Sequence, residues 1–154
     1  MKNPLKLQYV EYDKLSPKQK EIYNFQKVAS ILADYGFNCI KLADDWKGAD
    51  FLAYHKDGDQ TLKVQLKSGM GIYKKFIGKH LYMCFPIGKM GHLRIWYLIP
   101  HDKLVEIVRK VTPNALRTKA WCEKGFYTWP DPPPKALRER LSGFARRSKY
   151  SCEL

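Results

Sequence analysis

The stretch from Gly48 to Ser68 constrains the fold more than any other part of the chain. It reads GADFLAYHKDGDQTLKVQLKS and holds two apolar runs of strand length separated by Lys-Asp-Gly-Asp. Such runs on either side of an Asp-Gly pair predict an antiparallel hairpin with its turn at Asp57-Gly58. The turn then decides which side chains share a face.

The predicted register places three polar side chains on one face of this hairpin. Because side chains alternate along a strand, Asp50, Gln65 and Lys67 project from the same side. The expected cross-strand pairs are Lys56 with Asp59, Tyr54 with Thr61, Leu52 with Lys63 and Asp50 with Gln65. The opposite face is apolar and suits a core, with Phe51, Ala53, Leu62, Val64 and Leu66.

A carboxylate, an amide oxygen and an ammonium group at one end of a hairpin match the needs of metal-assisted phosphodiester hydrolysis. Carboxylate and amide oxygens suit a hard cation such as Mg²⁺, which prefers few protein ligands together with waters and substrate phosphate. A nearby lysine can orient the attacking water, help to deprotonate it and offset charge on the phosphate. The alternative is an ordinary amphipathic hairpin with a polar outer face.

At this spacing the hairpin resembles the PD-(D/E)xK phosphodiesterase superfamily, which includes restriction endonucleases, Holliday-junction resolvases, repair nucleases and some homing endonucleases. Ala49-Asp50 stands in the place of the Pro-Asp pair, and Gln65-Leu66-Lys67 in the place of the (D/E)xK tripeptide. The replaced proline supplies no ligand. Gln65 replaces an acid, as in the QxK variant of some restriction and homing enzymes. A neutral ligand weakens divalent-cation binding, so Gln65 is compatible with either a tuned or a lost activity.

The resemblance implies an α/β fold of the restriction-endonuclease-like type, with an αβββαβ core whose mixed sheet is flanked by helices. It implies a DNA endonuclease that uses Mg²⁺, or Mn²⁺ in its place. Asp50, Gln65 and the backbone carbonyl of Leu66 would hold the metal, and Lys67 would position the water. Cutting both strands needs two such sites, so we expect a homodimer or homotetramer. The rivals are a catalytically inactive nucleic-acid-binding module on the same fold and an RNA-binding protein that uses its aromatics without a metal.

A helix is predicted to begin at Pro17 and to run to about Tyr35. Ser16, Pro17 and Gln19 combine an N-cap, a proline at the first helical position and a capping box. Glu21 falls in the middle of the predicted apolar stripe, where an acid is costly unless it is paired or working. In the resemblance a glutamate of the first helix points at the metal site, which makes Glu21 a catalytic and metal-ligand candidate. The alternative is a glutamate that leans out to solvent or bonds a nearby lysine. The stripe itself comprises Ile22, Phe25, Val28, Ala29, Leu32 and Tyr35.

Shorter signals predict the other elements. Residues 38–43, 81–87 and 93–100 read as strands, residues 44–48 as a loop and residues 101–111 as a helix. The crossover helix after the hairpin is poorly marked in residues 69–80. We therefore expect a nuclease-like core over residues 1–112. Residues 113–154 read as an aromatic and proline-rich connection and a basic helix over residues 135–149, packed on the same domain. The alternative for that helix is oligomerisation through Leu137, Leu141 and Phe144.

The formal charge of +13 and the pI near 9.6 point to a polyanionic partner. DNA is expected rather than a membrane surface, because no segment reads as an amphipathic surface helix with a large apolar face. No apolar run approaches the roughly 20 residues of a bilayer span. The N-terminus lacks the apolar segment of a signal peptide, so we expect a cytoplasmic protein. The alternative is a merely solvated basic surface. The candidate DNA-contacting residues are Lys74, Lys75, Lys79, Arg138, Arg146 and Arg147.

The four cysteines are far apart and form no C-x-x-C pair. This spacing indicates neither a zinc site nor a disulfide framework. We expect free thiols, most of them buried.

Overall fold

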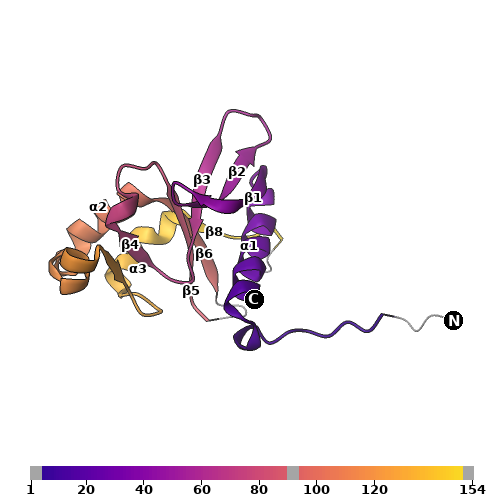
Figure 1. The fold of residues 1–154 in the computed structure, drawn as a ribbon, viewed down its shortest axis with the longest axis horizontal. Coiled ribbons are helices and arrows are strands. Elements are labelled where there is room, and N and C mark those ends of the chain that lie inside the picture. Colours follow the sequence, from indigo (N-terminus) through magenta and orange to yellow (C-terminus); the bar gives the residue numbers. More distant parts are fainter. Residues whose placement is uncertain (1–4, 90–93, 151–154) are drawn as a thin grey trace.

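The computed structural model describes residues 5–89 and 94–150 (Figure 1). Its centre is a mixed six-stranded sheet in the order β1-β2-β3-β5-β6-β8. All neighbouring strands are antiparallel except β3 and β5, which are parallel. The predicted α/β class with a mixed sheet is therefore confirmed. The main strands are β1 (Phe37–Trp46), β2 (Ala49–His55), β3 (Thr61–Leu66), β5 (Tyr82–Ile87), β6 (Ile95–Pro100) and β8 (Ala145–Arg146).

Helices cover both faces of this sheet. Helix α1 (Pro17–Ala33) packs on one face through Val28 and Leu32, against a layer that includes Phe51 and Val64. Helices α2 (His101–Val111) and α3 (Lys135–Leu141) pack on the other face. Successive side chains of a strand point into different layers: Met83 faces α2 and α3, whereas Cys84 faces α1. Among the described residues, no helix has both the length and the apolar character needed to cross a bilayer.

Helix α1 starts as its sequence predicts. The Ser16 side chain accepts from the Gln19 amide at 3.2 Å, and the Gln19 side chain accepts from the Ser16 amide at 2.9 Å. The predicted apolar stripe is wrong at its edges, since Ile22 and Tyr35 are 41% and 44% exposed. The buried face is centred on Asn24, Val28 and Leu32 instead.

Strand β1 runs through the residues for which a loop was expected. It continues to Trp46, which pairs with Ala49 across a two-residue turn of Lys47 and Gly48. Both turn residues have positive φ (55° and 88°), as a type I′ hairpin turn requires. A Cβ at Gly48 would lie 2.7 Å from a ring carbon of Phe76, so close packing also demands glycine here. The chain therefore reverses direction directly before Asp50.

The connection between the parallel strands β3 and β5 contains no α-helix. Residues 71–73 form strand β4 (Gly71–Tyr73), and Lys74–Phe76 form one 3₁₀ turn. The expectation of an αβββαβ core is wrong at this element. Strand β4 pairs with β7 (Phe126–Thr128), which lies in the segment expected to be an aromatic and proline-rich connection. Ile72 and Phe76 reach the core. Apolar side chains on this connection thus cover the sheet without a crossover helix.

The basic C-terminal helix is shorter than predicted. Helix α3 ends at Leu141, and Ala145–Arg146 form the edge strand β8 beside β6. Leu137 and Leu141 are fully buried in the core with α2, and Phe144 packs against that core. These side chains are used within the chain, which removes the basis for an oligomerisation helix.

The cysteines in the described ranges are free thiols, as predicted. Burial raises the pKa of Cys39 to about 11 and raises the pKa of Cys84 further still. Cys122 is exposed, so the expectation of mostly buried thiols holds for two of these three. Cys152 lies outside the described residues.

Candidate functional site

The hairpin of β2 and β3 has the predicted register over its central pairs, while Asp50 and Gln65 lie just beyond the paired residues. Tyr54 pairs with Thr61 and Leu52 pairs with Lys63. The connection is longer than a two-residue turn, because the His55 amide donates to the Gln60 carbonyl and the expected pair of Lys56 with Asp59 is absent from the register. The longer connection does not change which side chains share a face, so Asp50 and Gln65 lie on the same side of the hairpin.

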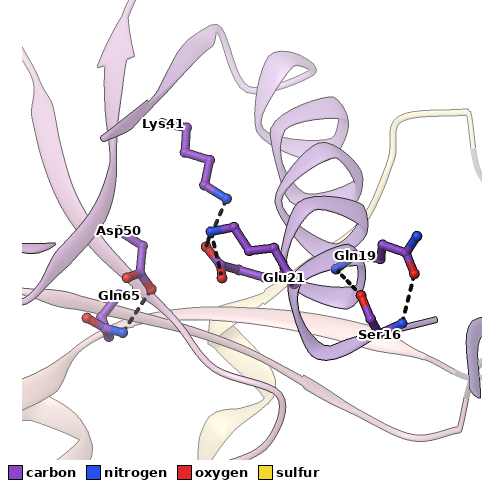
Figure 2. Close-up of polar contacts among 7 residues, drawn as sticks. Ser16, Gln19, Glu21, Lys41, Asp50 and Gln65 are labelled. Atoms are coloured by element: carbon purple, nitrogen blue, oxygen red, sulfur yellow. Dashed lines mark hydrogen bonds and ion pairs between the residues drawn. The ribbon is translucent and has the colours of Figure 1, made fainter. Parts of the chain in front are cut away.

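The two strands diverge at Asp50. The β2–β3 pairing ends at Phe51 and Val64, while Leu66 pairs with Cys84 of β5. At this point one carboxylate oxygen of Asp50 accepts from Gln65 Nε2 at 2.8 Å (Figure 2). The same oxygen accepts from the Leu66 amide at 2.8 Å. The carboxylate thus occupies the place of a backbone acceptor where the strands separate. This contact is the centre of the candidate site.

Gln65 carries an unusual acceptor. The residue is 6% exposed, and its Oε1 atom is buried without a hydrogen-bond partner among the described residues. A buried amide oxygen left without a partner costs free energy, of the order of 1–3 kcal/mol. The Gln65 amide presents its nitrogen to Asp50, so a cation beside Asp50 would gain this oxygen as a ligand after the amide turns over. The donor chemistry of Asp50 and Gln65, a carboxylate and an amide oxygen, fits a hard cation such as Mg²⁺.

Lys67 follows β3 on the same side as Gln65. Its amide donates to the Cys84 carbonyl at 2.8 Å, which continues the pairing with β5. Its ammonium lies 4.8 Å from the ring centre of Tyr73 and 6.0 Å from that of Phe76. Cation–π attraction therefore holds the ammonium over the connection that replaces the crossover helix.

Glu21 lies on α1, which covers the opposite face of the sheet from Gln65. Its side chain is 46% exposed and bonds Lys41 at 2.9 Å and Lys18 at 3.3 Å (Figure 2). The hydrogen bond from Lys41 is the main cause that lowers the pKa of Glu21. The expectation of an acid buried in the apolar stripe is wrong, and the lysine-bonded alternative describes the contacts observed.

Glu21 nevertheless borders the end of β3. It lines a pocket of about 300 Å³ together with Leu66 and Lys67. The structure therefore joins Asp50, Gln65 and Leu66 by direct hydrogen bonds and brings Glu21 near Lys67 around the end of the strand. In the described ranges no group of three or more His, Cys, Asp or Glu side chains is arranged to hold a metal. A cation at the hairpin would thus depend on Asp50, Gln65, the Leu66 carbonyl, water and substrate phosphate.

A second pocket lies beside the hairpin on the same side as Gln65. It has a volume of about 480 Å³ and is lined by four lysines, Lys47, Lys63, Lys75 and Lys79, with Gly48, Phe76 and Gly78. Two of these lysines were predicted to contact DNA. Lys63 was missed, although its position two residues before Gln65 on the same strand placed it on the same face. The third predicted cation of this segment, Lys74, lies 5.4 Å from the Trp121 ring.

The predicted C-terminal cations lie on another part of the molecule. Arg146 is in β8, which β5 and β6 separate from β3. Its guanidinium donates to the Gly143 and Ala145 carbonyls. Arg138 is exposed on α3 and donates to the Pro133 carbonyl, and Arg147 is exposed beyond β8. The structure does not bring these three arginines to the hairpin.

Two residues at the start of α2 support the site and were not predicted to do so. His101 is 1% exposed, and its Nε2 accepts from the Tyr73 amide at 3.1 Å. Burial lowers the pKa of His101, although Asp102 acts in the opposite direction. The Asp102 carboxylate accepts from the Gly78 amide at 3.0 Å and 3.2 Å. The sequence predicted their position directly after β6, but it did not predict that they accept hydrogen bonds from the connection between β3 and β5.

Comparison with known proteins adds no relative. No protein family, curated protein or solved structure matches this chain.

Proposed function

We propose that this protein is a Mg²⁺-dependent DNA endonuclease that hydrolyses phosphodiester bonds at the β2–β3 hairpin. The observation that carries the proposal is the contact of Asp50 with Gln65, which leaves the buried Gln65 Oε1 atom without a partner among the described residues. Turning the Gln65 amide over would place this oxygen beside the Asp50 carboxylate, and a carboxylate with an amide oxygen is a donor pair suited to a hard cation. The resemblance of Ala49-Asp50 and Gln65-Leu66-Lys67 to the PD-(D/E)xK pattern supports the same chemistry.

The roles follow from the chemistry of each side chain. Asp50, Gln65 and the Leu66 carbonyl would hold the cation, with Glu21 joining directly or through water. The bound cation would polarise the scissile phosphate and lower the pKa of its water. Lys67 would orient the nucleophilic water for in-line attack, which leaves a 5′-phosphate and a 3′-hydroxyl. Two copies of the chain, as a homodimer or homotetramer, would cut the two strands.

A second candidate is a DNA-binding protein on this fold without turnover. Two observations favour it: Asp50 already accepts hydrogen bonds from Gln65 and Leu66, and Glu21 is neutralised by Lys41 and Lys18. With a neutral amide in place of an acid, the site holds less negative charge to attract Mg²⁺. The net charge of +13 would still support binding to DNA.

Cleavage of supercoiled plasmid with Mg²⁺ separates these candidates. The unaltered protein should nick or linearise the plasmid, and EDTA should abolish the reaction. Asp50→Asn keeps the shape of the side chain and removes its charge, and Lys67→Met keeps the apolar stem and removes the ammonium. Both variants should lose at least about a hundredfold in rate. Asp57→Asn, at the exposed tip of the same hairpin, is the matched control and should cleave normally.

Three other outcomes of these experiments would contradict the proposal. Cleavage that survives both Asp50→Asn and Lys67→Met would remove the site assignment. Binding of DNA without cleavage by the unaltered protein would favour the inactive module. Strong preference for single-stranded RNA over duplex DNA would favour an RNA-binding protein that uses its exposed aromatic side chains.

A further inference from the structure

The four-lysine pocket beside the hairpin has the character of an anion site. Lys47, Lys63, Lys75 and Lys79 come from three separate segments and line one hollow, and none of its described lining residues is acidic. Four like charges around one volume repel each other, and a bound anion relieves that repulsion. We infer that this pocket binds a phosphate group of the nucleic acid strand, an inference that rests on the proposed function for its partner.

The loop that carries two of these lysines is held from several sides. The Lys63 ammonium donates to the Lys79 carbonyl at 3.1 Å, and the Gly78 amide donates to Asp102. Phe76 is 3% exposed and packs edge-on against His101, with ring centres 5.7 Å apart. Lys75 is thus attached to a fixed turn rather than to a free loop. Such pre-organisation reduces the entropy lost when an anion binds.

The opposite wall of the pocket is equally constrained. Lys47 occupies the type I′ turn and has a φ of 55°. Its neighbour Gly48 lies so close to Phe76 and Leu81 that a Cβ would clash with both. The tight packing brings the Lys47 turn against the 74–79 loop. The shape of this wall therefore depends on Gly48, which no other residue can replace without strain.

The pocket is placed to act together with the hairpin. Lys63 and Gln65 are two residues apart on the same face of β3. Phe76 lines the pocket and also lies 6.0 Å from the Lys67 ammonium. A strand whose phosphate occupies the pocket would lie on the face of β3 that carries Gln65. The phosphate can be a terminal monoester, which carries up to two charges, or an internal diester, which carries one.

The test measures binding without cleavage. Short DNA duplexes of one sequence, with a 5′-phosphate or a 5′-hydroxyl, are titrated in EDTA and followed by fluorescence anisotropy. The double variant Lys75→Gln/Lys79→Gln should bind either duplex at least about tenfold more weakly, and the slope of log K against log salt should become shallower by about 0.9 for each phosphate that the variant no longer neutralises. The matched control is Lys119→Gln/Lys135→Gln, which removes the same charge from side chains that are 82% and 81% exposed elsewhere.

Comparing the 5′-phosphate duplex with the 5′-hydroxyl duplex shows which kind of phosphate group the pocket binds. A preference for the 5′-phosphate that disappears in the pocket variant identifies a terminal monoester. Equal binding of both duplexes, weakened alike in the pocket variant, identifies an internal diester. Equal affinities and salt slopes for the pocket and control variants would overturn the inference. Because no Mg²⁺ is present, these results are independent of whether Asp50 supports cleavage.

Discussion

The Gln65 Nε2 atom lies 2.8 Å from an Asp50 carboxylate oxygen, while the other end of the same amide is buried without a partner among the described residues. In the absence of a cation this orientation is the stable one, because rotating the amide would bring two acceptors together. A cation would reverse the preference, since it attracts both oxygens. Under the proposed function, the stability of the hairpin would therefore depend on the binding of a divalent ion at this pair.

The first prediction concerns Gln65→Glu. Without divalent ions the variant should lose about 1–3 kcal/mol of unfolding free energy, because it removes a donor to Asp50 and places two acids in contact. With Mg²⁺ part of this loss should be recovered, since the second carboxylate strengthens cation binding. Urea denaturation in EDTA and in Mg²⁺ measures both effects.

The control for that experiment is Gln60→Glu, which makes the same charge change at an exposed position directly before β3. It should alter stability by no more than about 0.5 kcal/mol. If Gln65→Glu is as stable as the control and gains nothing from Mg²⁺, the cation site at the hairpin does not exist.

The second prediction concerns the ion pair of Glu21 with Lys41. Hydrogen bonding to Lys41 lowers the pKa of Glu21 in the folded protein, so the unfolded chain binds more protons at mildly acidic pH. The stabilisation is present above the unfolded pKa and is lost as the pH falls through the folded pKa. Lys41→Met should raise the Glu21 pKa toward its ordinary value, which an NMR titration of the carboxyl group reports.

The size of this effect is limited by exposure. The Glu21 side chain is 46% exposed, so solvent screens the pair and its loss should cost only about 0.2–1 kcal/mol. Lys14→Met, which removes the exposed partner of Glu11, should leave the Glu21 pKa unchanged. A Glu21 pKa that does not move in Lys41→Met would show that another group controls this carboxylate.

Local patterns predicted most elements of this fold, and long-range contacts decided the rest. The capping box at Ser16, the central pairs of the β2–β3 hairpin and helix α2 depend on neighbouring residues, and these are confirmed. The predicted two-residue turn of the hairpin is wrong. The β4–β7 pair joins residues more than fifty positions apart, and no short pattern in residues 71–73 indicates a partner at 126–128. Strand β8 was missed for the same reason, because it follows the C-terminal helix and lies far along the sequence from its partner β6.

The candidate site was predictable to the same extent. Alternation along two strands was enough to bring Asp50 to Gln65. Glu21 was misplaced because helical periodicity alone cannot fix the rotation of a helix against its sheet. Asn24 is buried on α1, and its side-chain amide donates to the Tyr12 hydroxyl at 2.8 Å. An apolar pattern would instead place this polar residue on the exposed side of the helix.

The third prediction concerns acid stability and His101. Burial lowers the pKa of this histidine in the folded state, so the unfolded chain binds the extra proton first. Stability should therefore fall as the pH drops from the ordinary histidine pKa, about 6.5, through the lower folded value. His101→Gln keeps a hydrogen-bond acceptor for the Tyr73 amide but does not titrate, so its denaturation midpoint should fall less steeply over this range. Parallel curves for the two proteins would contradict the prediction.

The last prediction concerns helix α3. Leu137 and Leu141 are fully buried against α2, so truncating either to alanine should cost about 2–5 kcal/mol of unfolding free energy. Arg140→Ala, on the exposed side of the same helix, should cost no more than about 0.5 kcal/mol. Urea denaturation measures the cost, and light scattering at several protein concentrations measures self-association. A loss of self-association in Leu141→Ala with unchanged unfolding free energy would instead make α3 an interface between copies of the chain. An unfolding cost that does not depend on protein concentration is expected, because both leucines complete the core of a single chain.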